Sequence, residues 1–246
     1  MAKQLGFIRT LRLPWLDAVA SLCAEGHDSA ETRRRLEAVV GLDVAGVDAL
    51  RKTLDVLMRV WVRSAEIDPA LHAEALCLFR SSVTTHERVR LHFGLCLLSF
   101  PLFRSCALYV GQMARADQPI TRRAVGQRAV AELGPLGGIQ RSVERVVASL
   151  VDWGVLQHER KGHLYLLARR AFHASQAAYD SWLLACALHA HPAEELPAAD
   201  LLALPELLPF RFQVAVGDLR ASPHFVLERQ GGGLDMVRLA HAGRRD

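Results

Sequence analysis

The sequence predicts a mainly α-helical protein in three parts: an N-terminal helical bundle (1–118), a central helix–turn–helix unit with a β-hairpin (119–170), and a C-terminal α+β segment with a small hairpin (171–246). Three observations predict this division. Apolar residues recur at helical spacing in the first part, basic residues gather in the second, and short alternating runs among Gly and Pro residues mark the third. With 51% hydrophobic and 23% charged residues, the 246-residue chain has the composition of a folded protein with a buried core.

The N-terminal part has apolar residues every three to four positions in six stretches, which predicts amphipathic helices. Pro14 and Pro69 stand where a first helical turn tolerates a missing N–H, and Thr84 stands where a cap is needed. The apolar run 93–103 is interrupted by Pro101 and is too short to cross a membrane, so we expect it in the core. The predicted helices are 15–24, 31–40, 47–62, 69–79, 87–98 and 103–114.

The central part predicts two helices, 121–133 and 139–153, separated by a glycine-rich turn and followed by short β-like runs at 155–158 and 163–167. This order is that of a winged helix-turn-helix. The second helix has an apolar face made of Ile139, Val143, Val146, Val147, Leu150 and Trp153. The face opposite is predicted to present Arg141, Arg145, Ser149 and Asp152.

Charge placement points to nucleic acid. Residues 121–170 contain nine Lys or Arg and four Asp or Glu, a net charge of +5, whereas the whole chain has a net charge of +4. The guanidinium fork of Arg matches phosphate oxygens and the guanine edge, so this concentration favours contact with double-stranded DNA. The candidate DNA-binding residues are Arg122, Arg123, Arg128, Arg141, Ser142, Arg145, Ser149, Arg160 and Lys161.

Each group of candidates has an expected role. The first half of a recognition helix enters the major groove, so we expect Arg141 and Arg145 there, with Ser149 beside them. The hairpin tip, which includes Arg160 and Lys161, is expected to follow the phosphate backbone, while the basic residues of 121–133 hold flanking phosphates. The first thirteen residues include Lys3, Arg9 and Arg12 without any acid, and form a second candidate basic arm.

The C-terminal part predicts a helix over 172–189 and strands over 210–216, 224–228 and 234–239, with a turn at Gly231–Gly233. Its clustered leucines are interpreted either as core or as a protein interface; they are Leu201, Leu202, Leu204, Leu207 and Leu208.

Catalytic, metal and cofactor patterns are missing from the sequence. It contains no GxSxG, HExxH, P-loop or GxGxxG motif, so we predict no enzymatic activity and no cofactor. Cys186, His189 and His191 have no matching acidic or thiol pair nearby to complete a ligand set, so no metal site is expected. Five scattered cysteines without a CxxC pair indicate buried free thiols, and hence a reducing, cytoplasmic location; four of them lie in apolar runs (Cys77, Cys96, Cys106 and Cys186).

Several short stretches resemble the BrxA family, an accessory component of BREX (bacteriophage exclusion) phage-defence systems. They are Leu98-Ser99-Phe100-Pro101-Leu102-Phe103-Arg104, Val151-Asp152-Trp153-Gly154-Val155-Leu156, Leu208-Pro209-Phe210 and Phe225-Val226-Leu227-Glu228-Arg229-Gln230-Gly231. The resemblance implies a mostly helical, cytoplasmic DNA-binding protein that works beside a methyltransferase, an ATPase and other defence subunits. It implies no catalytic residues, and Gly231-Gly232-Gly233 departs from the shorter Gln-Gly pattern of the family.

Four hypotheses follow. The first is a non-catalytic DNA-binding accessory protein of a BREX-type system, not associated with a membrane. The second is a winged-helix transcriptional regulator, which normally reads a palindrome as a dimer. The third is a scaffold subunit that binds protein through its winged helix. An enzyme is the fourth and weakest. The oligomeric state is not predicted.

Overall fold

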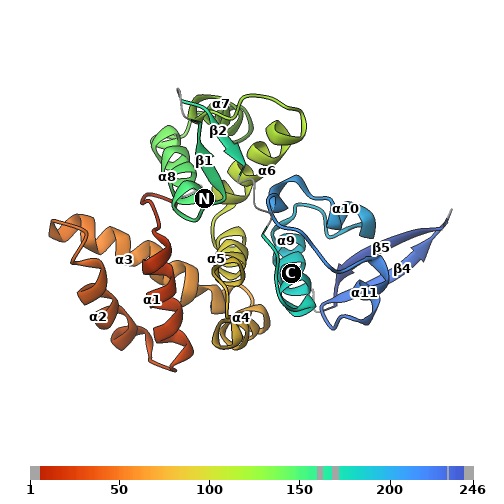
Figure 1. Cartoon of the computed structure of the whole chain (residues 1–246), viewed down its shortest axis with the longest axis horizontal. Helices are drawn as coiled ribbons and strands as arrows, with labels where there is room; N and C mark the ends of the chain where they lie inside the picture. The colour runs from red at the N-terminus through yellow and green to blue at the C-terminus, as the bar shows by residue number, and fades with distance from the viewer. Residues whose placement is uncertain (1–5, 160–162, 168–171, 232, 241–246) are drawn as a thin grey trace.

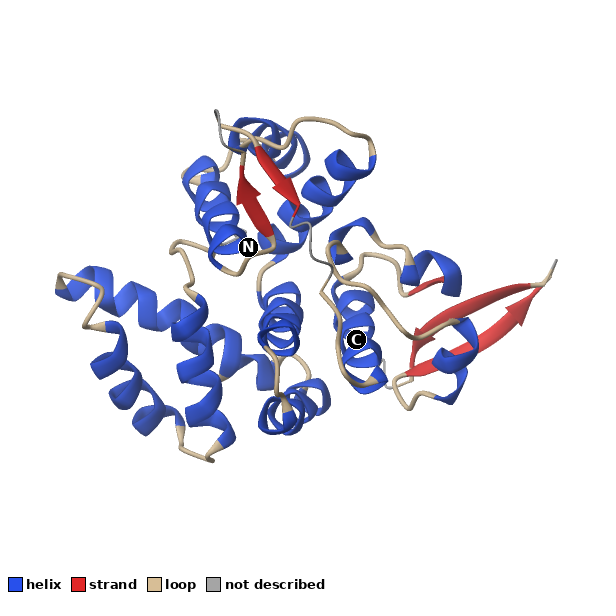
Figure 2. Cartoon of the chain, in the orientation of Figure 1, coloured by secondary structure: helices blue, strands red, loops and turns tan. Residues whose placement is uncertain are grey.

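The computed structural model describes residues 6–159, 163–167, 172–231 and 233–240. It confirms a mainly helical protein: in Figures 1 and 2 helices make up most of the chain, and the strands are confined to two small antiparallel sheets. The helices α1 to α3 lie on one side of α4 and α5, and α9 and the C-terminal sheet lie on the other (Figure 1).

The N-terminal half is helical throughout, as its apolar spacing predicts. Asp28 caps the second helix, and Thr84 and Glu87 form a reciprocal capping box on the fifth. The elements are α1 (Leu13–Ala24), α2 (Ser29–Val40), α3 (Val47–Trp61), a 3-10 turn (Arg63–Glu66), α4 (Pro69–Ser81), α5 (Thr85–Ser99) and α6 (Pro101–Arg115).

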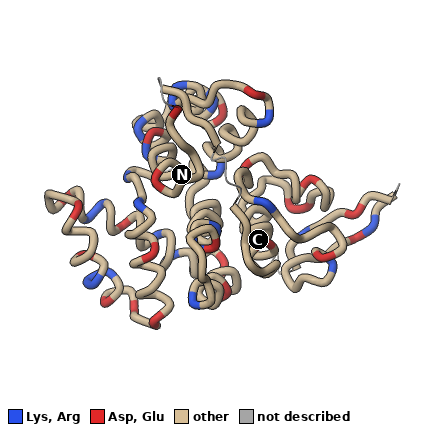
Figure 3. The backbone as a smooth tube through the Cα atoms, viewed as in Figure 1, with Lys and Arg blue, Asp and Glu red and all other residues tan. Residues whose placement is uncertain are grey.

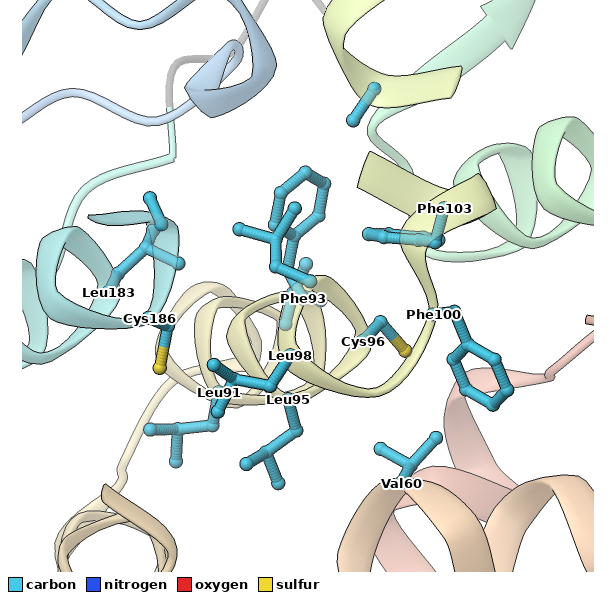
Figure 4. Packing of buried hydrophobic residues seen from close by; sticks show 14 of the residues in the cluster. Val60, Leu91, Phe93, Leu95, Cys96, Leu98, Phe100, Phe103, Leu183 and Cys186 are labelled. Atoms are coloured by element: carbon cyan, nitrogen blue, oxygen red, sulfur yellow. The ribbon is translucent and has the colours of Figure 1, made fainter. Parts of the chain in front are cut away.

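Helix α5 is the centre of the molecule. All residues from Val89 to Ser99 are buried, so this part of the helix has no solvent face. Figure 4 shows its side chains directed outward on every side, toward Leu183 of α9 and toward Val60 of α3. Gly94 allows the closest approach, because a Cβ there would lie 2.5 Å from the Trp182 ring of α9.

The run 93–103 therefore belongs to the core, as expected, and is divided between the end of α5 and the start of α6. Within the described residues no single helix is long and apolar enough to span a membrane; α5 and α6 reach that length only together, and they are bent by 119° where they meet.

Residues 116–167 continue with two helices and a hairpin, and the C-terminal part adds a helix and a three-stranded sheet. The elements are α7 (Arg122–Leu133), α8 (Ile139–Asp152), β1 (Leu156–His158), β2 (Tyr165–Leu167), α9 (Ala177–Ala190), β3 (Glu195–Pro197), α10 (Ala198–Leu202), a 3-10 turn (Pro205–Leu207), α11 (Val216–Ala221), β4 (Phe225–Gln230) and β5 (Leu234–Leu239). The C-terminal strands are antiparallel in the order β3-β5-β4.

Two C-terminal predictions are wrong, and both have the same cause. Residues 172–176 are not helical, because the backbone of Phe172 pairs with Phe210 and the amide of Ser175 donates to the buried Glu87 carboxylate. Residues 211–215 form no strand, because the Gln213 amide donates to Asp180. Side chains of α5 and α9 thus take the hydrogen bonds that a helix or a ladder would use.

Two other sequence observations are settled by burial. Leu201, Leu204 and Leu207 are buried, and Leu202 packs against the same core, so this leucine cluster belongs to the interior. Cys96, Cys106 and Cys186 are buried free thiols as expected, but Cys77 is exposed, because it lies on the outer side of α4.

Candidate nucleic-acid interface

Residues 119–167, which we call the basic segment, form one packed unit on α6. Helices α7 and α8 contact each other and α6, and β1 pairs with β2 in the register Leu156↔Leu167. Ile120, just before α7, forms an antiparallel bridge with Tyr165 of β2, so a third short extended piece borders the hairpin. Gly126 brings α7 close to α8, since a Cβ there would lie 2.2 Å from the Gln140 side chain. Figure 1 shows this unit above the central helix.

The apolar face predicted for α8 is confirmed. Every residue assigned to it is buried: Ile139, Val143, Val146, Val147, Leu150 and Trp153. Arg141 and Arg145, on the opposite face, are exposed. The first half of α8 therefore presents two guanidinium groups to solvent.

The two serines predicted beside them do not belong to this exposed face. Ser142 and Ser149 are both buried. The hydroxyl of Ser149 accepts a hydrogen bond from the Leu11 amide at 2.8 Å and donates to the Arg145 carbonyl at 2.9 Å. Asp152 accepts from the Leu13 amide at 2.6 Å. The chain before α1 covers α8 at Ser149, and Ser142 is buried as well, which corrects the assignment of both serines to the DNA-binding surface.

The arginines of α7 differ in their surroundings. Arg123 is exposed. The Arg122 Nε donates to the Tyr165 hydroxyl at 2.5 Å, and the guanidinium lies over the Tyr165 ring at 5.6 Å. Arg128 is half-buried and donates to the amide oxygens of Gln112 and Gln118 at 3.1 and 2.9 Å. These neutral partners fix two of the side chains without cancelling their charge.

The hairpin is described on both sides of its tip. Arg160 and Lys161, predicted at the tip, lie outside the described residues. His158 and His163 flank them and are exposed, and the His158 ring lies 4.8 Å from the Tyr165 ring. Tyr165 thus joins the hairpin to α7 through Arg122 and to the segment before α7 through Ile120.

The basic segment differs from the rest of the molecule in how its cations are paired. Among the described residues, none of its five arginines forms an ion pair with a carboxylate, whereas arginines elsewhere do so repeatedly. On α2, for example, Arg34 and Arg35 both bind Glu31, and Arg33 binds Asp55 at 2.8 Å. Figure 3 shows blue and red positions following one another closely along α2 and α3. The five arginines are Arg122, Arg123, Arg128, Arg141 and Arg145.

Sequence reasoning missed the neutral partners of this site. Gln112, Gln118 and Tyr165 hold two of the arginines, and a short amide or phenol side chain near a turn gives no signal of that role. The contact between α8 and the segment before α1 was also missed, because it joins residues about 138 positions apart. One signal of this contact was available in the sequence: the face of the second helix that was expected to be cationic also includes the uncharged Ser149 and the acidic Asp152.

The described residues offer no metal centre. No group of three His, Cys, Asp or Glu side chains among them lies close enough to hold an ion. His191 accepts a hydrogen bond from the Ala193 amide, and Cys186 is buried against α5. His92, in the core, accepts from the Trp61 indole at 3.0 Å and contacts Asp17 at 2.9 Å, so it belongs to a structural network.

Comparisons with known proteins add no family: neither a protein-family model, nor a curated protein, nor a solved structure matches this chain. The resemblance to the BrxA family therefore stays a prediction.

Proposed function

We propose that this protein is a non-catalytic DNA-binding protein that contacts duplex DNA through the basic segment. The observation that supports this most is the absence of ion pairs on five arginines of the segment's described residues, four of them exposed. Elsewhere in the same molecule acidic side chains neutralise many of the arginines, some of them within a few residues along a helix, although Arg63 and Arg115 have no such pair within the described residues. Uncompensated guanidinium groups gathered on one small unit favour a polyanionic partner, because each one that meets a phosphate releases condensed counterions.

The order of elements supports a winged-helix role for this unit. The sequence α6, Ile120 bridge, α7, α8, β1, β2 is the order of a helix-turn-helix followed by a wing, and Ile120 pairs with the second wing strand. In that role α8 is the recognition helix, so Arg141 and Arg145 enter the major groove. Arg122, Arg123 and Arg128 hold phosphates beside it, and the hairpin of β1 and β2 follows the backbone.

The biological setting is proposed from the sequence resemblance alone. A member of a BREX-type system would act on DNA beside a methyltransferase and an ATPase, and low sequence preference would suit that role. A regulator would instead give a two-fold symmetric footprint upstream of its own operon. The scaffold hypothesis loses its supporting feature, because the leucine cluster it relied on is in the core.

The deciding experiment replaces Arg141 and Arg145 with Gln and measures duplex binding by fluorescence anisotropy between about 50 and 200 mM salt. Removing these two cations from the bound surface weakens binding, and it lowers the slope of log affinity against log salt by up to about two, since each neutralised phosphate contributes about one. The matched control is Arg34→Gln with Arg35→Gln, which removes the same charge from a helix where both arginines bind Glu31. Equal loss in both double variants, or no loss in the first, would remove α8 from the interface.

A further inference from the structure

The chain between Gly6 and Arg12, which we call the arm, is fixed to α8 before it enters α1. The Leu11 amide donates to the Ser149 hydroxyl, the Trp153 indole donates to the Leu11 carbonyl at 2.8 Å, and the Leu13 amide donates to Asp152. Phe7 is fully buried, with its ring 5.1 Å from Phe100 and 5.8 Å from Phe103. The arm therefore has a defined position beside the recognition helix.

The hydrogen bonds also give the direction of the arm. Leu11 lies opposite Ser149, and Leu13 lies opposite Asp152, so the arm and α8 run the same way. Two residues of non-helical chain span up to about 7 Å, and one helical turn rises about 5.4 Å. Arg9 precedes Leu11 by two residues, and Arg145 precedes Ser149 by one turn. Arg9, at a bend of the chain, therefore stands two residues from the contact with Ser149, which lies one helical turn after Arg145.

The two arginines of the arm differ in pairing. Arg12 forms an ion pair with Asp43 at 2.8 Å and lies over the Trp15 ring at 5.3 Å. Arg9 is half-buried, has no carboxylate partner among the described residues, and its buried Nε has no hydrogen-bond partner there. Its charge is therefore uncompensated within the described residues. A half-buried guanidinium without a partner is costly by itself but is favoured where a phosphate accepts its hydrogen bonds.

We infer that Arg9 is a DNA-contacting residue, and that it binds the phosphate backbone next to the groove entered by Arg145. This inference rests on the proposed function of the basic segment and extends its surface to the N-terminal arm. The arm thereby couples the recognition helix to α1 and, through Arg12 and Asp43, to the α2–α3 connection. The partner is the sugar–phosphate backbone of duplex DNA, which is contacted without regard to base sequence.

The test compares Arg9→Gln with Arg12→Gln in the full chain, on a short labelled duplex over a salt series. Arg9→Gln is expected to reduce the slope of log affinity against log salt by about one. The loss of affinity that it causes is therefore about tenfold larger at 0.1 M salt than at 1 M salt. Arg12→Gln leaves the slope unchanged, because Asp43 already neutralises that side chain. Arg9→Lys retains the slope, since a phosphate contact needs charge rather than a bidentate fork.

The outcomes separate this inference from the function on which it rests. If the double Arg141 and Arg145 variant loses the salt slope while Arg9→Gln keeps it, the inference fails and the proposed function stands. If Arg9→Gln and Arg12→Gln lower the slope equally, general charge loss explains both, and the placement of Arg9 is wrong. If the unmodified protein binds no duplex, the proposed function itself fails. Unchanged thermal unfolding of Arg9→Gln ensures that any loss comes from the removed contact.

Discussion

Two regions of this molecule use arginine for different purposes. In the helices that surround the basic segment, several arginines are bound to carboxylates: Arg90 meets Asp180 at 2.9 Å, and Arg104 meets Glu206 at 2.8 Å, although Arg115 of α6 has no such partner among the described residues. In the basic segment, described arginines meet only neutral groups or solvent. The first set joins elements distant in sequence, and the second leaves its charge available to a partner.

The difference shows that composition alone does not reveal which arginines lack a carboxylate partner. Arg33, Arg34 and Arg35 form the densest run of cations in the first half of the chain, yet Asp55 and Glu31 neutralise them. Arg141 and Arg145 are fewer, but the turn of α8 between them contributes only Glu144, which forms no ion pair among the described residues. The two regions therefore differ in how many of their arginines are paired, and substitutions of paired and unpaired side chains test this difference.

The largest effect is expected from Arg90→Met, which breaks the most buried pair. Both Arg90 and Asp180 are fully buried, and Arg90 also donates to the Arg211 carbonyl at 2.8 Å. Removing the cation leaves a carboxylate buried without its counter-charge, so the free energy of unfolding should fall by about 3–5 kcal/mol. Denaturant titration measures it.

The matched variant in the other region is Arg145→Met, which should change stability by no more than about 0.5 kcal/mol because the side chain is exposed and unpaired. A second comparison uses Arg90→Met with Asp180→Leu, which removes both charges and should recover part of the loss. Equal destabilisation by Arg90→Met and Arg145→Met would contradict the division between the two regions.

An intermediate effect is expected from a substitution of Glu87 of α5, which stabilises the fold around the central helix through hydrogen bonds. Burial alone would raise the pKa of this carboxyl, but donation from Ser175 and from the Val83 and Thr84 amides outweighs it and lowers the pKa from 4.5 to about 2. A lowered pKa in the folded state means that the ionised form stabilises the fold above pH 4.5, and that this contribution is lost as the pH falls toward 2.

Glu87→Gln should therefore cost about 2–3 kcal/mol at neutral pH and flatten the loss of stability between pH 4.5 and 2. Urea unfolding across that pH range measures both quantities. DNA binding at neutral pH should be unaffected once the variant is folded, because Glu87 is buried on α5, outside the basic segment. A variant that retains the full acid dependence would show that other carboxylates cause it.

The local part of this fold could be predicted from sequence, and the long-range part could not. The spacing of Val143, Val147 and Leu150 defines the buried face of α8, because periodicity depends only on neighbours along the helix. The burial of Ser149 depends on Leu11, and the conformation around Ser175 depends on Glu87. Such contacts join residues that are remote in sequence, and no pattern in either segment indicates them.

The same limit applies to the site. The concentration of basic residues in 121–170 was visible from counting, and the exposure of Arg141 and Arg145 followed from helix geometry. Which arginines are paired was not visible, because the partners of Arg33 and Arg88 lie 22 and 71 residues away. In the sequence, Arg9 is only one of three basic residues near the N-terminus. It differs from Arg12 because Asp43 pairs with Arg12, a contact that only the structure shows.

The smallest effect, and the most direct test of pairing, is expected from Glu31→Gln. The side chain is at the surface, and Arg34 and Arg35 both donate to it, which lowers the pKa of Glu31 to about 2. Exposed pairs of this kind add little to stability, so the unfolding midpoint should not move measurably.

The substitution nevertheless frees two guanidinium groups on one helix. In a protein that already lacks Arg141 and Arg145, we expect Glu31→Gln to restore weak, salt-sensitive duplex binding. The salt slope that it regains should be smaller than the slope lost with the two arginines of α8. Recovery should be partial because α2 offers the charge alone. It has no neighbouring hairpin, and it is not presented as a recognition helix whose first half can enter a groove. If anisotropy shows no recovery of duplex binding, arginine pairing is not what separates the two regions. The shape of the basic segment must then account for its binding to DNA.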